Sequence, residues 1–158
     1  MADVLLEGDR EAFDGPVRLL WPEDVWSLAV PAAREAHAGA IARVRAVLGD
    51  PEIISLAYES FDALYWNFRY LQGREAWTTV GPLIERYAPP LGPGVAERFA
   101  WSREVTDDQV VQATSYRERL CRHMQTILGG NGVILMPSMP DIAPLRASPE
   151  STLEDYRN

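Results

Sequence analysis

The order of apolar and polar residues predicts a strand, a helix and a second strand in the first third of the chain. Val17–Trp21 is a short apolar run between two prolines and is typical of a strand. Within Pro31–Leu48 the apolar residues recur at helical spacing, and Gly49 follows where a C-terminal cap belongs. Glu52–Ala57 is the second predicted strand. Strand, helix and strand with short links favour a right-handed parallel crossover, and so an α/β fold over an all-α one.

Two further helices are predicted in the middle of the chain. Ser60 is placed to cap a long helix that continues to Val80, where Gly81-Pro82 breaks or kinks it before a last turn. A loop rich in proline and glycine follows, and Val95–Arg103 resumes a helix.

A third helix begins at Thr106, which forms a capping-box pattern with Gln109, and it continues to Leu128. One apolar face is predicted for it, made by Val110, Thr114, Cys121, Met124 and Leu128.

The end of the chain predicts a turn, a strand and a loop. Gly129–Gly132 follows a helix and precedes an apolar strand, Val133–Met136, so it is a turn and not a phosphate-binding loop. A loop rich in proline and methionine, Pro137–Pro149, comes next, and Ser148 is placed to cap a new helix.

Both ends of the chain resemble interrupted helices. Met1–Glu7 looks like the last turns of a helix that Gly8 ends, and the helix capped by Ser148 has only begun at Asn158. We therefore expect residues 1–158 to form a single, partial domain.

The basic residues are unusual, because the chain has 15 arginines and no lysine. This excludes a P-loop lysine, a Schiff-base lysine and a Ser–Lys catalytic pair within the chain. Biased codon use is an alternative source of the arginine excess. The formal net charge of −8 argues against nucleic acid or an anionic membrane as a partner.

The remaining composition indicates a cytoplasmic domain. Cys121 is the single cysteine, so no intrachain disulfide can form, and no apolar run is long enough to cross a membrane. Met1–Glu11 is acidic and lacks the pattern of a signal peptide. No cofactor is expected.

The residues most able to carry catalysis are better explained by structure. His37 is expected to be a half-buried helical histidine, and Cys121 to pack in the core, where a thiolate is disfavoured. His123 is two residues from Cys121 and points to another side of the helix, so no metal site is expected.

Aromatic side chains and one arginine are the better candidates for a binding site. A dense aromatic series is expected to be mostly core, with an apolar pocket or partner surface as the alternative: Tyr58, Phe61, Tyr65, Trp66, Phe68, Tyr70 and Trp77. Arg98 stands in apolar company, so it forms either a structural ion pair or a contact with an anionic or carbonyl group of a ligand. Ser138 follows the last strand, where parallel sheets form ligand crevices, although rigidity of the loop equally explains its prolines.

Three stretches, in order, resemble the amidase signature family: Phe68–Trp77 (FRYLQGREAW), Leu91–Phe99 (LGPGVAERF) and Val133–Leu145 (VILMPSMPDIAPL). The opening residues through Leu20 are similar to the family's linker and strand after its signature half. Within the family, the chain is most similar to amidases of the indole-acetamide-hydrolase kind. The resemblance implies a helix-rich fragment of the amidase signature fold, with short, mainly parallel strands and flanking helices.

The family mechanism that the resemblance implies is amide hydrolysis by a Ser–Ser–Lys triad, with backbone N–H groups holding the oxyanion. This chain has no lysine, no adjacent serines and no Gly/Ser-rich signature segment, so no catalytic residue is assigned. The resemblance suggests Arg98 and Ser138 as substrate-binding positions, with Tyr65 and Phe68 as an apolar wall.

We therefore expect the substrate-pocket portion of an amidase, inactive alone, that acts on a linear carboxamide in the complete enzyme. The alternative is a non-catalytic binding or interaction module that keeps the amidase half-fold. The expected partners are a small amide substrate and either a second copy of the chain or a complementing amidase segment.

Overall fold

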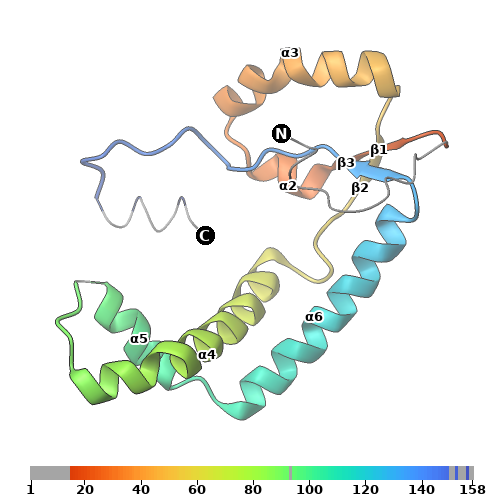
Figure 1. Ribbon diagram of the computed structural model, residues 1–158. Coiled ribbons are helices and arrows are strands. Elements are labelled where there is room, and N and C mark those ends of the chain that lie inside the picture. The colour runs from red at the N-terminus through yellow and green to blue at the C-terminus, as the bar shows by residue number, and fades with distance from the viewer. Residues whose placement is uncertain (1–14, 93, 150–151, 153–155, 157–158) are drawn as a thin grey trace, which may run out of the picture.

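The described part of the molecule consists of a short parallel sheet with two helices beside it and an arm of three further helices (Figure 1). The computed structural model describes residues 15–92, 94–149, 152 and 156. In these residues the elements follow one another as β1 (Arg18–Pro22), α2 (Glu23–Leu28), α3 (Pro31–Leu48), β2 (Glu52–Ile54), α4 (Phe61–Tyr87), α5 (Val95–Arg103), α6 (Asp107–Leu128) and β3 (Gly132–Ile134). The predicted α/β fold is confirmed.

The three strands form one parallel sheet in the order β2-β1-β3. Trp21 of β1 lies opposite Ile53 of β2, and Leu19 lies opposite Val133 of β3. The central strand is the most protected, because Leu19 and Leu20 are buried while Ile53 and Val133 on the outer strands are exposed. The predicted parallel pairing of the first two strands is correct, although β2 ends at Ile54 rather than at Ala57.

The short helix α2 was not predicted from the sequence, and it connects β1 to α3. Trp26 on α2 is buried and stacks on Trp21, with ring centroids 4.3 Å apart and planes 5° from parallel. Its indole Nε1 donates a hydrogen bond to the carbonyl of Leu135, 2.8 Å away, in the segment that follows β3. The aromatic pair therefore joins the end of β1 to the end of β3.

Asp24, in the first turn of α2, binds the segment that leaves β2. Its Oδ2 accepts hydrogen bonds from the Ser55 hydroxyl at 2.9 Å and from the backbone N–H groups of Leu56 and Ala57 at 2.8 Å each. Its Oδ1 accepts from the N–H groups of Val25 and Leu56 at 3.0 Å each. Partial burial acts to raise the pKa of this carboxyl, but the hydrogen bonds outweigh it and the pKa is lowered.

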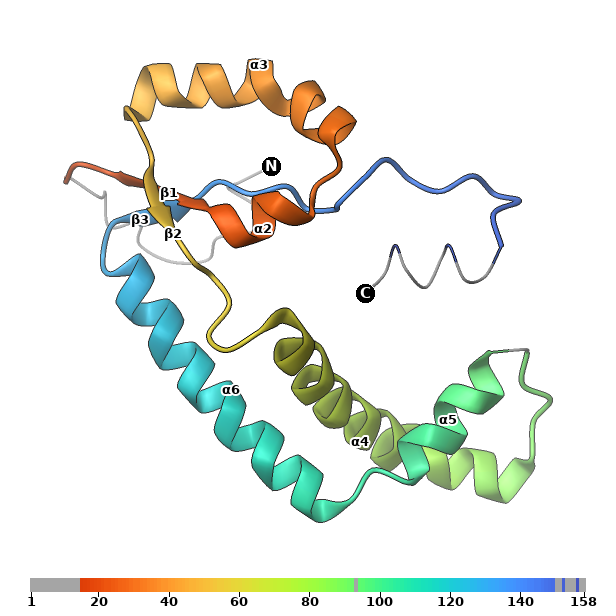
Figure 2. The ribbon, with the colours of Figure 1, turned by 180° about the vertical axis from the view of Figure 1, so that it is seen from behind.

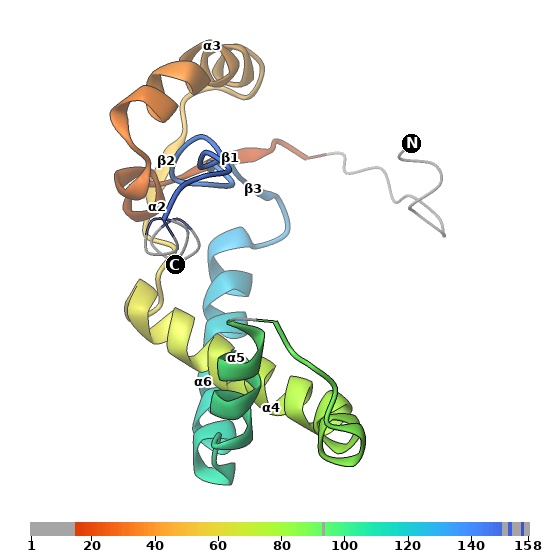
Figure 3. The same ribbon diagram turned by 90° about the vertical axis from the view of Figure 1, so that its left-hand side faces the viewer.

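The helices α4, α5 and α6 form an arm that extends away from the sheet, on the side opposite α3 (Figures 2 and 3). Helices α5 and α6 both pack against α4. The predicted caps are confirmed: the Ser60 hydroxyl accepts from the N–H of Ala63, and Thr106 forms the full capping box with Gln109. None of the helices in the described ranges is long and apolar enough to cross a membrane.

A break or a kink was predicted at Gly81-Pro82; the break does not occur, because helix α4 continues through Pro82 to Tyr87. Gly81 is buried, and a Cβ added there would lie 2.7 Å from the indole ring of Trp77. The bare backbone of Gly81 therefore lets Trp77 cover the helix at the point where proline removes a backbone donor.

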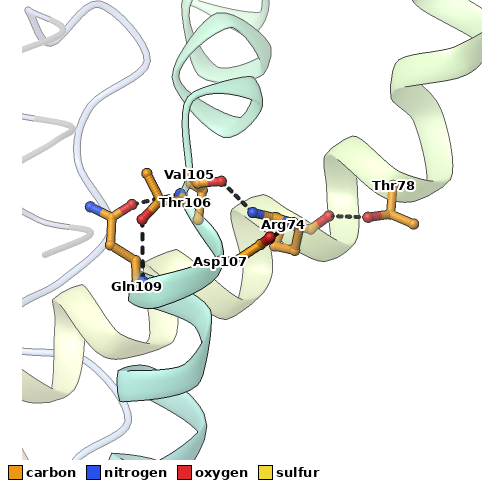
Figure 4. Close-up of polar contacts among 6 residues, drawn as sticks. All are labelled: Arg74, Thr78, Val105, Thr106, Asp107 and Gln109. Atoms are coloured by element: carbon orange, nitrogen blue, oxygen red, sulfur yellow. Dashed lines mark hydrogen bonds and ion pairs between the residues drawn. The ribbon is translucent and has the colours of Figure 1, made fainter.

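An arginine clamp connects α4 to the turn between α5 and α6 (Figure 4). The guanidinium of Arg74 donates to the carbonyl of Val105 at 2.5 Å and forms an ion pair with Asp107 at 2.6 Å. Val105 is buried beside this contact. The clamp fixes where α6 starts, which adds a tertiary contact to the local capping box.

The apolar face predicted for α6 is displaced from the one that packs. Ala113 and Tyr116 are the buried residues of this helix, whereas Thr114 and Cys121 are exposed. Cys121 is therefore not a core residue, because α4 covers the neighbouring side of α6. The predicted turn after Leu128 is present, and Gly129 ends the helix with a φ of 55°.

The helix predicted at Met1–Glu7 lies outside the described residues, and so does most of the helix predicted to begin at Ser148.

Replacing Asp24 by Asn should lower the free energy of unfolding at pH 7 by about 1–3 kcal/mol, because charge-assisted hydrogen bonds are lost. The pKa of Asp24 is lowered in the folded chain, so its stabilisation is complete above the unfolded pKa of about 3.9. It is lost as the pH falls through the folded pKa.

The difference in stability between wild type and Asp24→Asn should therefore shrink below about pH 4. Urea unfolding at several pH values measures it. Asp62→Asn is the matched control, because Asp62 is also an acidic residue in the first turn of a helix. Equal losses for both variants would contradict the role of Asp24.

Candidate functional site

A cavity between α4 and α5 is the candidate binding site. Its volume is about 340 Å³, within the range of small-molecule sites. Among the described residues, two arginines and no acidic residue line it; these lining residues are Arg69, Gln72, Gly73, Ala76, Val95, Arg98, Phe99, Trp101 and Ser102. The cavity therefore combines cationic groups with apolar walls.

The guanidinium of Arg69 lies across one wall of this cavity. It is centred 4.9 Å from the ring of Trp101, a cation–π distance. One terminal nitrogen, Nη1, donates to Oε1 of Gln72 at 3.3 Å, a long hydrogen bond. Its Nε is buried and has no hydrogen-bond partner among the described residues. Arg69 thus carries a donor that the surrounding protein does not use.

An aromatic cluster holds Trp101 in place. Tyr70 of α4 stacks on Trp101 with centroids 6.2 Å apart and planes 19° from parallel. Trp66 lies 6.5 Å from Trp101, and Tyr65 contacts Trp66 edge to face at 5.3 Å. The aromatic series is therefore neither all core nor all surface, since Trp66 remains 41% exposed.

Gly73 allows α5 to approach α4 closely enough to form the cavity. A Cβ built at Gly73 would lie 2.6 Å from Cζ3 of Trp101 and 3.4 Å from the hydroxyl of Ser102. Ser102 is itself buried, at 7% exposure. Any larger residue at position 73 would displace the indole that forms the wall.

Of the residues predicted from the sequence, Arg98 is the one that lines this cavity. Tyr65 is half-buried and belongs to the aromatic cluster behind the wall. Phe68 is 56% exposed. Neither Tyr65 nor Phe68 is a lining residue of the cavity, so they do not form its apolar wall; Val95, Phe99 and Trp101 do.

Ser138 lies in a different part of the molecule. It is exposed on the loop that follows β3, and the neighbouring Pro140 accepts a hydrogen bond from the N–H of Val30 at 2.9 Å. This loop runs beside the sheet and α2, whereas α5 lies at the far part of the helical arm (Figures 1 and 2). Ser138 and Arg98 are therefore not brought together.

The histidines and the cysteine do not form a catalytic arrangement in the described residues. His37 is exposed rather than half-buried, and its Nδ1 lies 2.6 Å from the carbonyl of Ala33 one turn earlier. His123 packs against Tyr58 with ring centroids 5.4 Å apart, on a different side of α6 from the exposed Cys121. No group of His, Cys, Asp and Glu in the described ranges is placed to hold a metal ion.

Sequence reasoning missed Arg69 and Trp101 as cavity residues. Both belong to stretches that were predicted as helix, but nothing local indicates that position 69 faces position 101. The one available signal is Gly73, a small residue inside a long aromatic helix, which is typical of a close approach by another element.

Gly73→Ala should destabilise the chain by about 1–3 kcal/mol, because the added methyl group collides with Trp101 and forces the wall to shift. Tryptophan fluorescence and urea unfolding measure the shift and the loss. Gly39→Ala is the matched control: it lies inside α3, and its added Cβ would meet only Nη1 of Arg43 at 3.8 Å. The control should be neutral or slightly stabilising, and a Gly73 variant as stable as the control would contradict this packing.

Comparison with known proteins relates the chain to an amidase. It is 29% identical to Amidase 1 of Arabidopsis thaliana over 99 residues, which cover 63% of this chain and 23% of that protein. It is also 22% identical to Outer envelope protein 64, chloroplastic, of Arabidopsis thaliana over 136 residues. These residues cover 86% of this chain and 21% of that protein. The matches thus span less than a quarter of either relative. No family model matches the chain, and no solved structure matches it.

Proposed function

We propose that this chain is the substrate-side portion of an amidase, an enzyme that hydrolyses a linear carboxamide to an acid and ammonia or an amine. The observation that carries the proposal is the similarity to Amidase 1 over 99 residues. The order of the three stretches that resembles the amidase signature family supports the same proposal. The α/β fold with a short parallel sheet agrees with it.

In this proposal the chain binds and orients the amide, and other residues perform the chemistry. Arg98 lines a cavity of suitable volume and offers donors to a carbonyl or anionic group. Ser138, Tyr65 and Phe68 remain proposed substrate positions that become relevant when further protein packs beside them. Holding the substrate in place supplies the orientation on which acyl transfer depends.

The nucleophile and the base of the proposed reaction come from outside these 158 residues. The family mechanism needs a lysine, and this chain has none. Arginine does not replace it as a base, because a guanidinium keeps its proton in proteins. The chain alone is therefore proposed to be inactive. A cytoplasmic location belongs to the same proposal and rests on the single cysteine.

The purified chain should not hydrolyse aryl or aliphatic amides above the rate in buffer. Hydrolysis should appear when the chain is co-expressed with Amidase 1 from which the matching 99-residue segment has been removed. Release of ammonia measures both. Serine-dependent hydrolysis by the chain alone would disprove the assignment.

In the complemented enzyme, Arg98→Ala should lower kcat/KM by about tenfold or more, because a hydrogen bond from a charged group to the substrate is lost. Arg117→Ala is the control, since Arg117 is an exposed arginine on α6 and is not a lining residue of the cavity. Equal activity of both variants would remove Arg98 from the proposed pocket.

A non-catalytic interaction module is the second candidate, and it would need a partner that covers the exposed apolar side chains. Large apolar side chains are exposed over the sheet edge, the arm and the loop after β3, including Ile53, Phe68, Leu83, Ile142 and Leu145. A partner segment that packed against these side chains would remove them from water.

Size-exclusion chromatography with light scattering separates the two candidates. The amidase-portion proposal predicts a dimer or aggregates at micromolar concentration, because bare apolar faces associate with one another. An independent module would be a monomer with a single cooperative melting transition. A stable, cooperative monomer would therefore favour the module over the amidase portion.

A further inference from the structure

We propose that the cavity between α4 and α5 binds a small planar carboxylate, and that Arg69 is the residue that binds the carboxylate group. The inference deepens the proposed function by naming a substrate class, amides that also carry a carboxylate. Only this choice of substrate class rests on the proposed function. The binding site itself follows from the cavity alone.

The charge of the cavity is opposite to that of the chain. The chain has a formal net charge of −8, yet the described residues that line this cavity include Arg69 and no acidic residue. The net negative charge of the chain repels an anion, whereas the arginine side chains in this cavity attract it. A neutral ligand gains nothing from this difference.

Arg69 offers the donors that a carboxylate needs. Its Nε is buried and has no partner among the described residues, and its Nη1 has only the long 3.3 Å hydrogen bond to Gln72. A carboxylate can accept two parallel hydrogen bonds from one edge of a guanidinium. When the long hydrogen bond to Gln72 breaks, the guanidinium can turn toward the ligand. It then replaces the neutral amide oxygen of Gln72 by a carboxylate that accepts two charge-assisted hydrogen bonds.

The remaining walls select a flat, apolar body. Trp101 lies under the guanidinium of Arg69 at 4.9 Å, and Tyr70 stacks on Trp101 so that the indole is held in position. Val95, Phe99 and Ala76 complete an apolar lining in a volume of about 340 Å³. An aryl carboxylate satisfies both parts, with its ring against the apolar walls and its carboxylate toward Arg69.

Benzoate and benzamide are suitable probes, because they have nearly the same shape and differ in charge. Titration of each into the ¹⁵N-labelled full chain can be followed at the indole N–H signals, of which Trp101 is assigned with a Trp101→Phe variant. Benzoate should shift the Trp101 signal and bind about ten times more tightly than benzamide. Equal binding, or no shift with benzoate, would overturn the proposal.

Arg69→Met should abolish the preference for benzoate, so that the two probes bind within about a factor of two of each other. Arg103→Met is the matched control. Arg103 also lies over a tryptophan, 5.7 Å from the ring of Trp77, and pairs with Glu85, but it is not a lining residue of the cavity. The control should keep the tenfold preference, and a preference that survives in Arg69→Met would refute the role of Arg69.

Arg69→Lys covers the case in which the Met variant does not fold. It keeps the charge and removes the planar fork, so the preference for benzoate should fall below that of wild type but not vanish. An unchanged preference would contradict bidentate binding. The binding experiment measures no turnover, so it tests the cavity separately from the amidase activity. If benzoate binds but complementation fails, only the amidase proposal is disproved. If complementation succeeds but benzoate does not bind, only the carboxylate-site proposal is disproved.

Discussion

The carboxylate of Asp24 is the contact on which the arrangement of the two parts of this molecule depends. β1 runs directly into α2, so Asp24 stands at the carboxyl end of the central strand. Its hydrogen bonds hold Ser55, Leu56 and Ala57, the residues that leave β2 toward α4. This side chain therefore holds the segment through which the sheet leads into the helical arm, and it must be ionised to accept all of these bonds.

The same short helix also holds the end of β3. Trp26 binds the carbonyl of Leu135, and the N–H of Val30 binds the carbonyl of Pro140. The segments that follow all three strands thus contact α2 or Ala29-Val30, the two residues after it. These contacts place the start of the loop with Ser138 beside the sheet. In the arm, Arg74 and the cap at Thr106 fix the turn between α5 and α6 against α4. The proposed substrate positions Arg98 and Ser138 thus lie in different parts of the molecule, on α5 and on the loop after β3.

The sequence predicted most where the signals are local. Val95–Arg103 and Pro31–Leu48 have the bounds expected from their glycine and proline neighbours, and the caps at Ser60 and Thr106 are confirmed. The six residues of α2 are too few to show a helical period, so that helix was missed. The face of α6 was misplaced because Thr114 and Cys121 were judged by residue type, whereas the position of α4 decides which side is covered. Arg69 and Trp101 meet only through tertiary packing, and no spacing along the chain could have joined them.

The absence of lysine has a structural side as well as a catalytic one. Within the part of the chain that the structure describes, four arginines lie over aromatic rings: Arg69 on Trp101, Arg86 on Tyr87, Arg103 on Trp77 and Arg119 on Tyr116. A flat guanidinium can cover a ring and still present donors at its edges, whereas an ammonium is a compact, strongly hydrated charge. A guanidinium also keeps its proton, so these side chains can bind anions but cannot act as a base. The chain is thus equipped to hold a polar group of a ligand in an aromatic setting and not to activate a nucleophile. Binding without chemistry is what the proposed role as a substrate-side portion of an amidase requires, and arginines at the cavity between α4 and α5 have the chemistry for it.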